Sequence, residues 1–201
     1  QTGTNVTFNS DFVVEDASNL TGAGQFTLTA GTLTLDGNFL GSDFAIAGGT
    51  LSGTNSFQGG ATWTGGTLRD GSTTNDPEAE FVINDPSGND IINHSFTNDG
   101  NVQWLAGDII ANTGSVFYNR TNLDDSADAT FRTSSGTVAI FNNTLTGSYQ
   151  KLGSGTTKFA TIFNNEGSVY VEAGSLILDG NGTTSSTGSF DVGDRDIRGS
   201  T

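Results

Sequence analysis

The chain has 201 residues, and its 22 acidic against 7 basic side chains give it a formal net charge of −15. This balance argues against nucleic acid or an anionic membrane surface as a partner, because both are gripped through basic side chains. The chain contains no Cys, which excludes disulfides and thiolate metal sites. No apolar run approaches the length of a membrane span.

Composition and the first residue indicate where the protein works. The chain begins with Gln1 and contains no Met, so we expect it to have been processed, for example by removal of a signal peptide. An acidic chain rich in Thr, Ser, Asn and Gly is more typical of an extracellular surface than of a cytosolic enzyme. We therefore expect an extracellular or cell-surface location.

A short repeat marks the N-terminal section, residues 1–69. The segments FTLTAGTL (26–33), FAIAGGTL (44–51) and ATWTGGTL (61–68) share the pattern apolar-x-apolar-x-Ala/Gly-Gly-Thr-Leu. Apolar and polar residues alternate within each segment, which predicts a half-buried strand. Each strand is followed by Gly, which allows the positive φ that a tight corner needs. A recurrence of about 18 residues predicts short-period coils that stack on one another.

The next stretch, residues 70–92 (DGSTTNDPEAEFVINDPSGNDII), breaks the pattern and holds both prolines, Pro77 and Pro86. Proline cannot donate to a strand ladder. We therefore predict a loop or small hairpin inserted between coils, within a single domain that spans residues 1–201.

Residues 93–201 return to the pattern with a longer period of about 22 residues. VQWLAGDI (102–109) and VYVEAGSL (169–176) follow the same frame, and a Phe followed closely by Asn recurs at 96, 117, 141 and 163. The aligned inward positions predict a solenoid core of two columns, the first made of Leu28, Ile46, Trp63, Trp104 and Val171 and the second of Leu33, Leu51, Leu68, Ile109 and Leu176. The side-chain amides of Asn98, Asn143 and Asn165 are predicted to stack as a hydrogen-bonded ladder at one corner.

These repeats predict an all-β, parallel β-solenoid of roughly ten coils. VQWLAGDI and the run 141–193 resemble the parallel β-helix repeats of large bacterial secreted and cell-surface proteins of the adhesin and autotransporter-passenger kind. The resemblance covers about half of the chain well and the first 68 residues loosely. It implies a right-handed solenoid with a structural or adhesive role, and it is more specific for the fold than for the function.

Few residues are suited to catalysis or to metal binding. His94 is the single histidine, and we expect it at the surface or at a corner. The acidic residues fall mostly in turns, where solvated charge is the simpler interpretation. The loops 84–90 and 191–196 are candidates for structural calcium, but neither matches an established calcium-loop spacing. We expect no catalytic residues and no cofactor.

The function we expect is that of a non-catalytic structural solenoid. The ends of a parallel solenoid are open rows of backbone groups, and no cap is evident in the sequence. The expected partners are therefore copies of the chain, head to tail in a filament, or adjoining coils in the stalk of a larger surface protein. The alternative is an adhesin or glycan-binding module that uses exposed aromatic residues, Tyr118, Tyr149 and Tyr170. A polysaccharide lyase or hydrolase built on Arg120, Asp124 and Asp125 ranks third.

Overall fold

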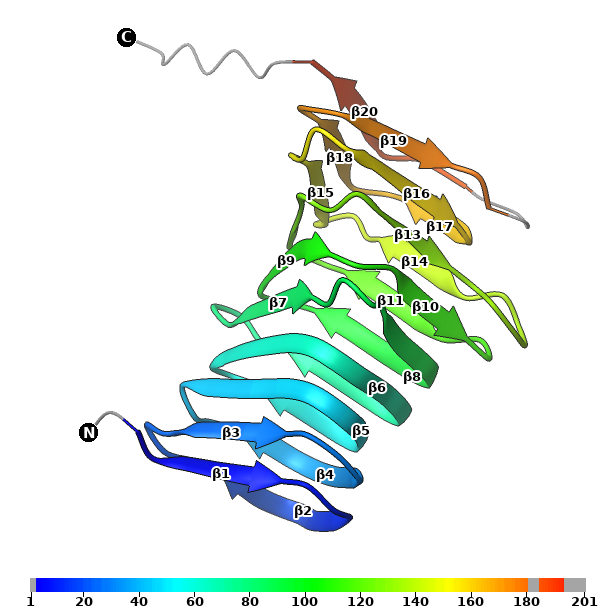
Figure 1. Cartoon of the computed structure of the whole chain (residues 1–201). Coiled ribbons are helices and arrows are strands. Elements are labelled where there is room, and N and C mark those ends of the chain that lie inside the picture. The colour runs from blue at the N-terminus through cyan, green and yellow to red at the C-terminus, as the bar shows by residue number, and fades with distance from the viewer. Residues whose placement is uncertain (1–2, 181–184, 194–201) are drawn as a thin grey trace, which may run out of the picture.

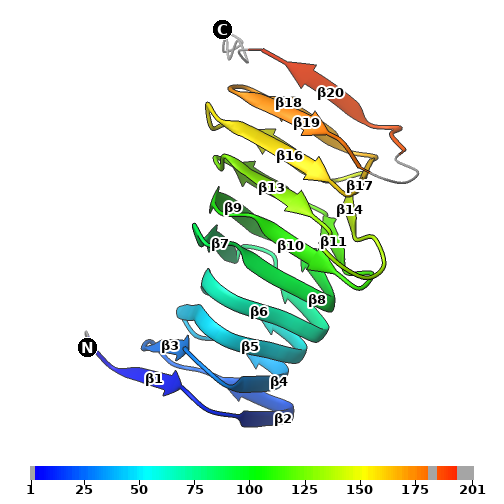
Figure 2. The ribbon, with the colours of Figure 1, turned by 45° about the vertical axis from the view of Figure 1, so that its right-hand side comes forward.

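The computed structural model describes residues 3–180 and 185–193 and shows a parallel β-solenoid of about 9 turns. This confirms the all-β parallel fold predicted from the repeats, whereas its right-handed sense stays a prediction. The turns stack into a rod that begins at β1 and β2 and ends at β19 and β20 (Figures 1 and 2). The described residues include no helix that could cross a membrane.

Twenty strands of the described residues form one sheet through parallel pairing. They are β1 (Asn5–Phe8), β2 (Phe12–Leu20), β3 (Gln25–Leu28), β4 (Thr32–Phe39), β5 (Asp43–Phe57), β6 (Gly60–Asn75), β7 (Glu80–Asn84), β8 (Asn89–Asn98), β9 (Asn101–Ala106), β10 (Ile109–Asn112), β11 (Val116–Asn119), β12 (Asn122–Asp125), β13 (Ala129–Arg132), β14 (Ile140–Asn143), β15 (Ser148–Lys151), β16 (Thr156–Ala160), β17 (Ile162–Asn165), β18 (Ser168–Val171), β19 (Ser175–Leu178) and β20 (Ser189–Val192).

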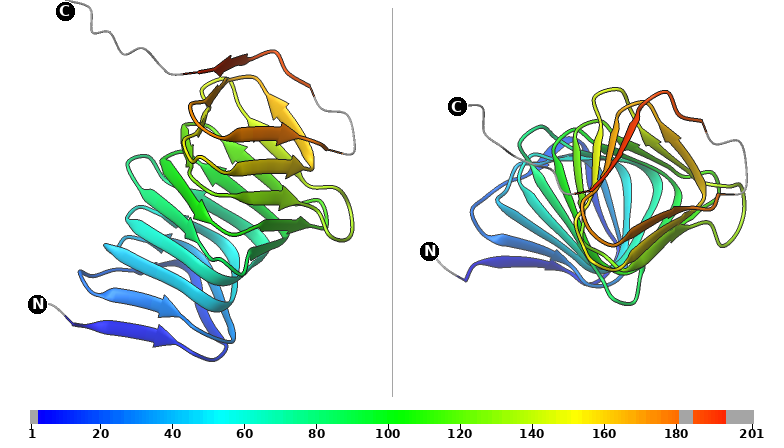
Figure 3. Two further views of the ribbon diagram at one scale, coloured as in Figure 1. Left: turned by 45° about the horizontal axis from the view of Figure 1, so that its top comes forward. Right: turned by 90° about the horizontal axis from the view of Figure 1, so that it is seen from above.

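Each turn of the solenoid has three faces, which we number in the order in which the chain passes through them. Face 1 holds β1, β3, β7, β9, β12, β15, β18 and β20, face 2 holds β10, β13, β16 and β19, and face 3 holds β11, β14 and β17. β2, β4 and β8 each run through faces 2 and 3, and the long strands β5 and β6 bend and contribute to all three faces. Seen from above, successive turns are rotated relative to one another, as the right-handed twist of strands leads us to expect (Figure 3).

The segment 70–92 is part of the solenoid, so the predicted insertion is wrong. β6 continues to Asn75, β7 pairs with β6 and β9, and β8 pairs with β6 from Asp90 onward. Pro77 and Pro86 both lie in turns between strands, where the backbone N–H is not required for the ladder. The prolines therefore mark corners of the solenoid and do not interrupt it.

The interior of face 1 is one column of residues in register. It runs through Phe8, Leu28, Ile46, Trp63, Ile83, Trp104, Asp125, Lys151, Val171 and Val192. Leu28, Ile46 and Trp63 are completely buried. The five predicted members of the first column thus share one line, but a turn that contributes Ile83 separates the two tryptophans. Between Trp104 and Val171 the column carries a carboxylate and an ammonium group.

The second predicted column is correct for its first three members and wrong for the last two. Leu33, Leu51 and Leu68 follow one another in register, but Ile91 and Ala111 continue that line. Ile109 is buried elsewhere, in register with Phe131, and the half-buried Leu176 is in register with Thr157.

The cause of this error is a corner of variable length. Leu68 follows Trp63 by 68 − 63 = 5 residues, whereas Ala111, its equivalent, follows Trp104 by 111 − 104 = 7 residues. Equal spacing in the sequence therefore does not give equal position on face 2.

Face 3 contributes a stack of aromatic rings to the core. Phe96, Phe117, Phe141 and Phe163 are Cα partners in successive turns, with ring centroids 4.8, 5.2 and 5.2 Å apart and nearly parallel planes. Burying each ring contributes on the order of 2 kcal/mol. One phenylalanine per turn thus allows a chain with few strong hydrophobes to keep a continuous core.

Candidate functional sites in the interior and at the ends

A ladder of asparagine side chains runs inside the corner that follows the phenylalanine stack. Its members are Asn75, Asn98, Asn119, Asn143 and Asn165, which are Cα partners in successive turns and almost completely buried. The Nδ2 of each of the first four members donates to the Oδ1 of the next member, at 2.9, 2.9, 2.8 and 2.8 Å. The second N–H of these amides donates to a backbone carbonyl of the same corner, for example Asn119 to Ser148 O at 3.0 Å.

The structure brings together all three predicted ladder residues and adds two that the sequence interpretation missed. Asn119 follows Phe117 with the same spacing as the others, so the Phe-x-Asn marker was sufficient to find it. Asn75 follows Thr73 instead of a phenylalanine and carries no such marker. It takes the place that Phe39 and Phe57 occupy in the preceding turns, so the same column changes from aromatic rings to amides.

A charged cluster lies in the interior of face 1. Asp125, Lys151 and Tyr149 are all completely buried, and Lys151 Nζ lies 4.0 Å from Asp125 Oδ1. The Tyr149 hydroxyl donates to Asp125 Oδ2, and Lys151 Nζ donates to the carbonyls of Ala127 and Gly153, both at 2.9 Å. Loss of solvent raises the pKa of Asp125, although its hydrogen bonds and the Lys151 charge act in the opposite direction. Burial, together with the Asp125 charge, raises the pKa of Tyr149 well above its usual value.

This cluster corrects two predictions from the sequence. Tyr149 is not an exposed aromatic residue, because its ring packs inside the coil against Phe141 and Phe159. Asp125 cannot share a surface cleft with Arg120, because Asp125 points inward while Arg120 pairs with Asp99 at 3.5 Å on the outside.

His94 is also buried, with 2% of its surface exposed, so the expected surface position is wrong. Its Nε2 lies 3.0 Å from Thr73 Oγ1, and that hydroxyl donates to Asn55 Oδ1 at 2.8 Å. Nε2 must therefore be the donor, which leaves Nδ1 unprotonated and without a hydrogen-bond partner. Desolvation lowers the pKa of His94 from 6.5 to about 4, with a partial offset from the Arg69 backbone and the Asp70 charge. The imidazole is thus a neutral part of the core.

The acidic residues that were considered for calcium do not form a ligand cluster among the residues described. No group of three or more His, Asp or Glu side chains in this part of the chain is placed to hold a metal ion. In the loop 84–90, Asp85 is buried and its Oδ1 accepts a hydrogen bond from Ser87 N at 2.8 Å, which closes the turn. The second loop, 191–196, extends beyond the described residues at position 194.

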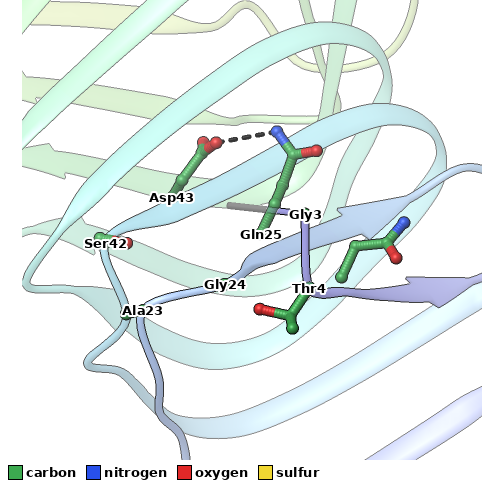
Figure 4. Close-up of a pocket in the computed structure, with 8 residues that line it drawn as sticks. Gly3, Thr4, Ala23, Gly24, Gln25, Ser42 and Asp43 are labelled. Carbon is green, nitrogen blue, oxygen red and sulfur yellow. Dashed lines mark hydrogen bonds between the residues drawn. The ribbon is translucent and has the colours of Figure 1, made fainter. Parts of the chain in front are cut away.

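A hollow of about 560 Å³ opens on the side of the first turns (Figure 4). Its lining residues are Gly3, Thr4, Asn5, Ala23, Gly24, Gln25, Ser42 and Asp43. Gln25 Nε2 donates to Asp43 Oδ2 at 2.8 Å, and the lining offers one carboxyl group. A glycosidase needs two. The hollow therefore offers hydrogen-bonding groups without an acid–base pair.

Another small hollow, of about 270 Å³, lies on the outside of face 3. Tyr118, Asn142 and Asn164 line it in successive turns, together with Asn143, Thr144, Glu166 and Ser185. The guanidinium of Arg120 lies 5.8 Å from the centre of the Tyr118 ring. An aromatic ring beside amides and a carboxylate is a combination that can contact a polar ligand.

Both ends of the described solenoid are open. β1 and β2 pair on one side only, with β3 and β4, and β19 and β20 pair on one side only, with β16 and β18. The apolar columns of the core continue to both ends, where their last side chains are exposed. Phe12, Leu178 and Phe190 are exposed, whereas their partners one turn inward lie in the core. Each end therefore combines unpaired backbone groups with apolar side chains.

The fold and these sites define the class of protein as a parallel β-solenoid with a polar ladder in its core. No protein-family model, no curated protein and no solved structure matches the chain.

Proposed function

We propose that this protein is a non-catalytic structural rod of the extracellular space, whose ends pair with further β-solenoid turns. The neighbouring turns belong either to identical copies, which gives a filament, or to adjoining coils of a larger surface protein of the adhesin or autotransporter-passenger kind. The observation that supports the proposal is that both ends expose apolar side chains and unpaired strand edges, which no other described residue covers.

The backbone geometry at β20 supports pairing with a further strand. Ser189 N donates to Gly167 O at 2.9 Å, and Gly193 N donates to Val171 O at 3.1 Å. Because successive N–H groups of a strand point in opposite directions, those of Phe190 and Val192 point away from β18, toward the open edge. A β1-like strand of a second copy can accept these bonds, and such a head-to-tail contact does not close, so it grows into a fibre.

A matched pair of substitutions tests the filament. Val192 and Leu145 are 77% and 78% exposed, but Val192 lies on the open end and Leu145 on the side of the rod. We expect the wild-type chain and the side variant Leu145→Glu to associate with increasing concentration, as seen by analytical ultracentrifugation and electron microscopy. Val192→Glu should remain monomeric, because it buries a carboxylate in the end-to-end contact. A wild-type chain that stays monomeric at every concentration refutes the filament.

A second candidate, glycan binding, is favoured by the hollow around Tyr118. Tyrosine beside amides can stack on a sugar ring and bond to its hydroxyl groups. The test is a glycan array with the wild-type chain and Tyr118→Ala. Loss of a signal in the variant supports binding at this hollow, and an array without any bound glycan removes the candidate.

A further inference from the structure

The buried pair of Lys151 and Asp125 is placed for a reaction that a surface ion pair could not undergo. The two residues are Cα partners on adjacent turns, and neither side chain is reached by solvent. Trp104 lies in register one turn before Asp125, and Val171 lies one turn after Lys151. The amine and the carboxyl group are therefore held together between apolar layers, with Nζ and Oδ1 4.0 Å apart.

We propose that Lys151 and Asp125 become joined by an amide bond between their side chains, formed by the folded chain itself. Nζ first passes a proton to the Asp125 carboxylate, which gives an amine and a carboxylic acid. The amine then attacks Cγ, so that a bond from Nζ to Cγ forms and one bond from Cγ to oxygen breaks. The departing oxygen leaves as water with a second proton from Nζ, and no oxidant or other reactant is consumed.

The surroundings favour each part of this step. Burial raises the pKa of Asp125, which favours the protonated carboxyl group that the first proton transfer produces. The Tyr149 hydroxyl donates to Oδ2, so it is placed to polarise the carboxyl group and to stabilise the negative charge that develops on Oδ2 when the amine attacks. Holding two groups side by side in a folded core replaces an encounter in solution by an intramolecular reaction.

Neighbouring backbone groups aim the amine. Lys151 Nζ donates to the carbonyl of Ala127, two residues after Asp125, so the ammonium is drawn to the chain segment that carries the carboxyl group. Ala127 N in turn donates to Asp125 Oδ1 at 2.8 Å and fixes the carboxyl plane. The remaining gap between Nζ and Oδ1 is 4.0 Å.

The consequence is a covalent tie between β12 and β15. The chain has no Cys, so a side-chain amide supplies the type of cross-link that a disulfide would otherwise provide. The tie closes a loop from residue 125 to residue 151, and unfolding of this turn would leave that loop closed.

Mass spectrometry of the purified full chain tests the proposal. The intact mass should be lower than the sequence mass by one water molecule. Trypsin should not cut after Lys151, and the digest should contain a branched species made of residues 121–132 joined to residues 133–158. Free peptides 121–132 and 133–151 in place of the branched species would overturn the proposal, even with a water loss, because an Asp-Gly succinimide loses water without branching.

Two substitutions separate the chemistry from a structural effect. In Asp125→Asn the same attack releases ammonia, so the mass deficit should change from water to ammonia while the branch point stays the same. In Tyr149→Phe the refolded chain should form the branched species at least tenfold more slowly, because removing one hydrogen-bond donor to a developing oxyanion lowers a rate by roughly a hundredfold or more. If Tyr149→Phe reacts at the wild-type rate, the role assigned to the tyrosine is wrong, whereas the branched species still decides the cross-link.

Discussion

The asparagine ladder gives a quantitative prediction about stability. Asn119→Leu keeps the branched shape of the side chain and its number of heavy atoms but removes the amide. It leaves Asn98 Nδ2 without its acceptor at 2.9 Å and Asn143 Oδ1 without its donor at 2.8 Å. Orphaned buried groups cost about 1–3 kcal/mol each, and the added apolar burial returns about 1–2 kcal/mol. We therefore expect a net loss of about 3 kcal/mol in the free energy of unfolding.

Asn75→Leu is the matched control at the start of the ladder. Asn75 Oδ1 accepts no hydrogen bond in the structure, and Asn98 Oδ1 keeps a second donor, Gly100 N at 3.2 Å, when Asn75 is replaced. This substitution should cost about 1 kcal/mol or less. Urea denaturation followed by the fluorescence of the buried Trp63 and Trp104 measures both variants. A cost for Asn119→Leu no larger than that for Asn75→Leu would refute the ladder as a source of stability.

Three further substitutions probe the buried histidine and a corner where two backbone segments approach closely. The single His94 should titrate in NMR with a pKa of about 4, and since its usual value is 6.5, the unfolded chain binds the proton first as pH falls. Relative to His94→Gln, the wild type should thus keep its full free energy of unfolding above pH 6.5 and lose about 3 kcal/mol of it as the pH falls toward 4. If the free energy of unfolding has the same pH profile in both proteins, the burial assigned to His94 is wrong. Gly107 and Gly114 both have positive φ, but a Cβ at Gly107 would overlap the Asp85 carbonyl, whereas at Gly114 the nearest atom is 3.7 Å away. Gly107→Ala should therefore cost clearly more than the roughly 1 kcal/mol expected of Gly114→Ala, and equal unfolding midpoints would disprove the close approach.

Most of the fold could be predicted from the repeats, because a solenoid is built from local sequence patterns. Alternation placed Leu28, Ile46 and Trp63 inward, and stacking placed their equivalents in one line without any knowledge of distant contacts. The turn with Ile83 was missed because the two prolines that flank it read as loop signals. A proline shows only that its backbone donates no hydrogen bond to the strand ladder. This is true of a corner between strands as well as of an inserted loop.

The polar residues of the interior were harder to predict than the apolar ones. Asp125 and Lys151 occupy inward positions of strands whose other inward residues, Leu123 and Tyr149, are apolar. The alternation therefore indicated that both side chains point inward, but charged residues are normally assigned to the outside. His94 was misplaced for the same reason. The open ends, in contrast, follow from the architecture itself once the coils are stacked.

The junction between β10 and β13 gives the rod a mechanical weak point. Only Ile109 with Phe131 and Ile110 with Arg132 are in register there, whereas β12 and β15 match over four residues at the next step of face 1. Among the described strands of face 2, this step has the fewest residues in register, so it is the step of that face that separates most easily. We expect tension along the rod to separate face 2 first between β10 and β13, while the four registered pairs of β9 with β12 and of β11 with β14 hold the same two turns together on the other faces.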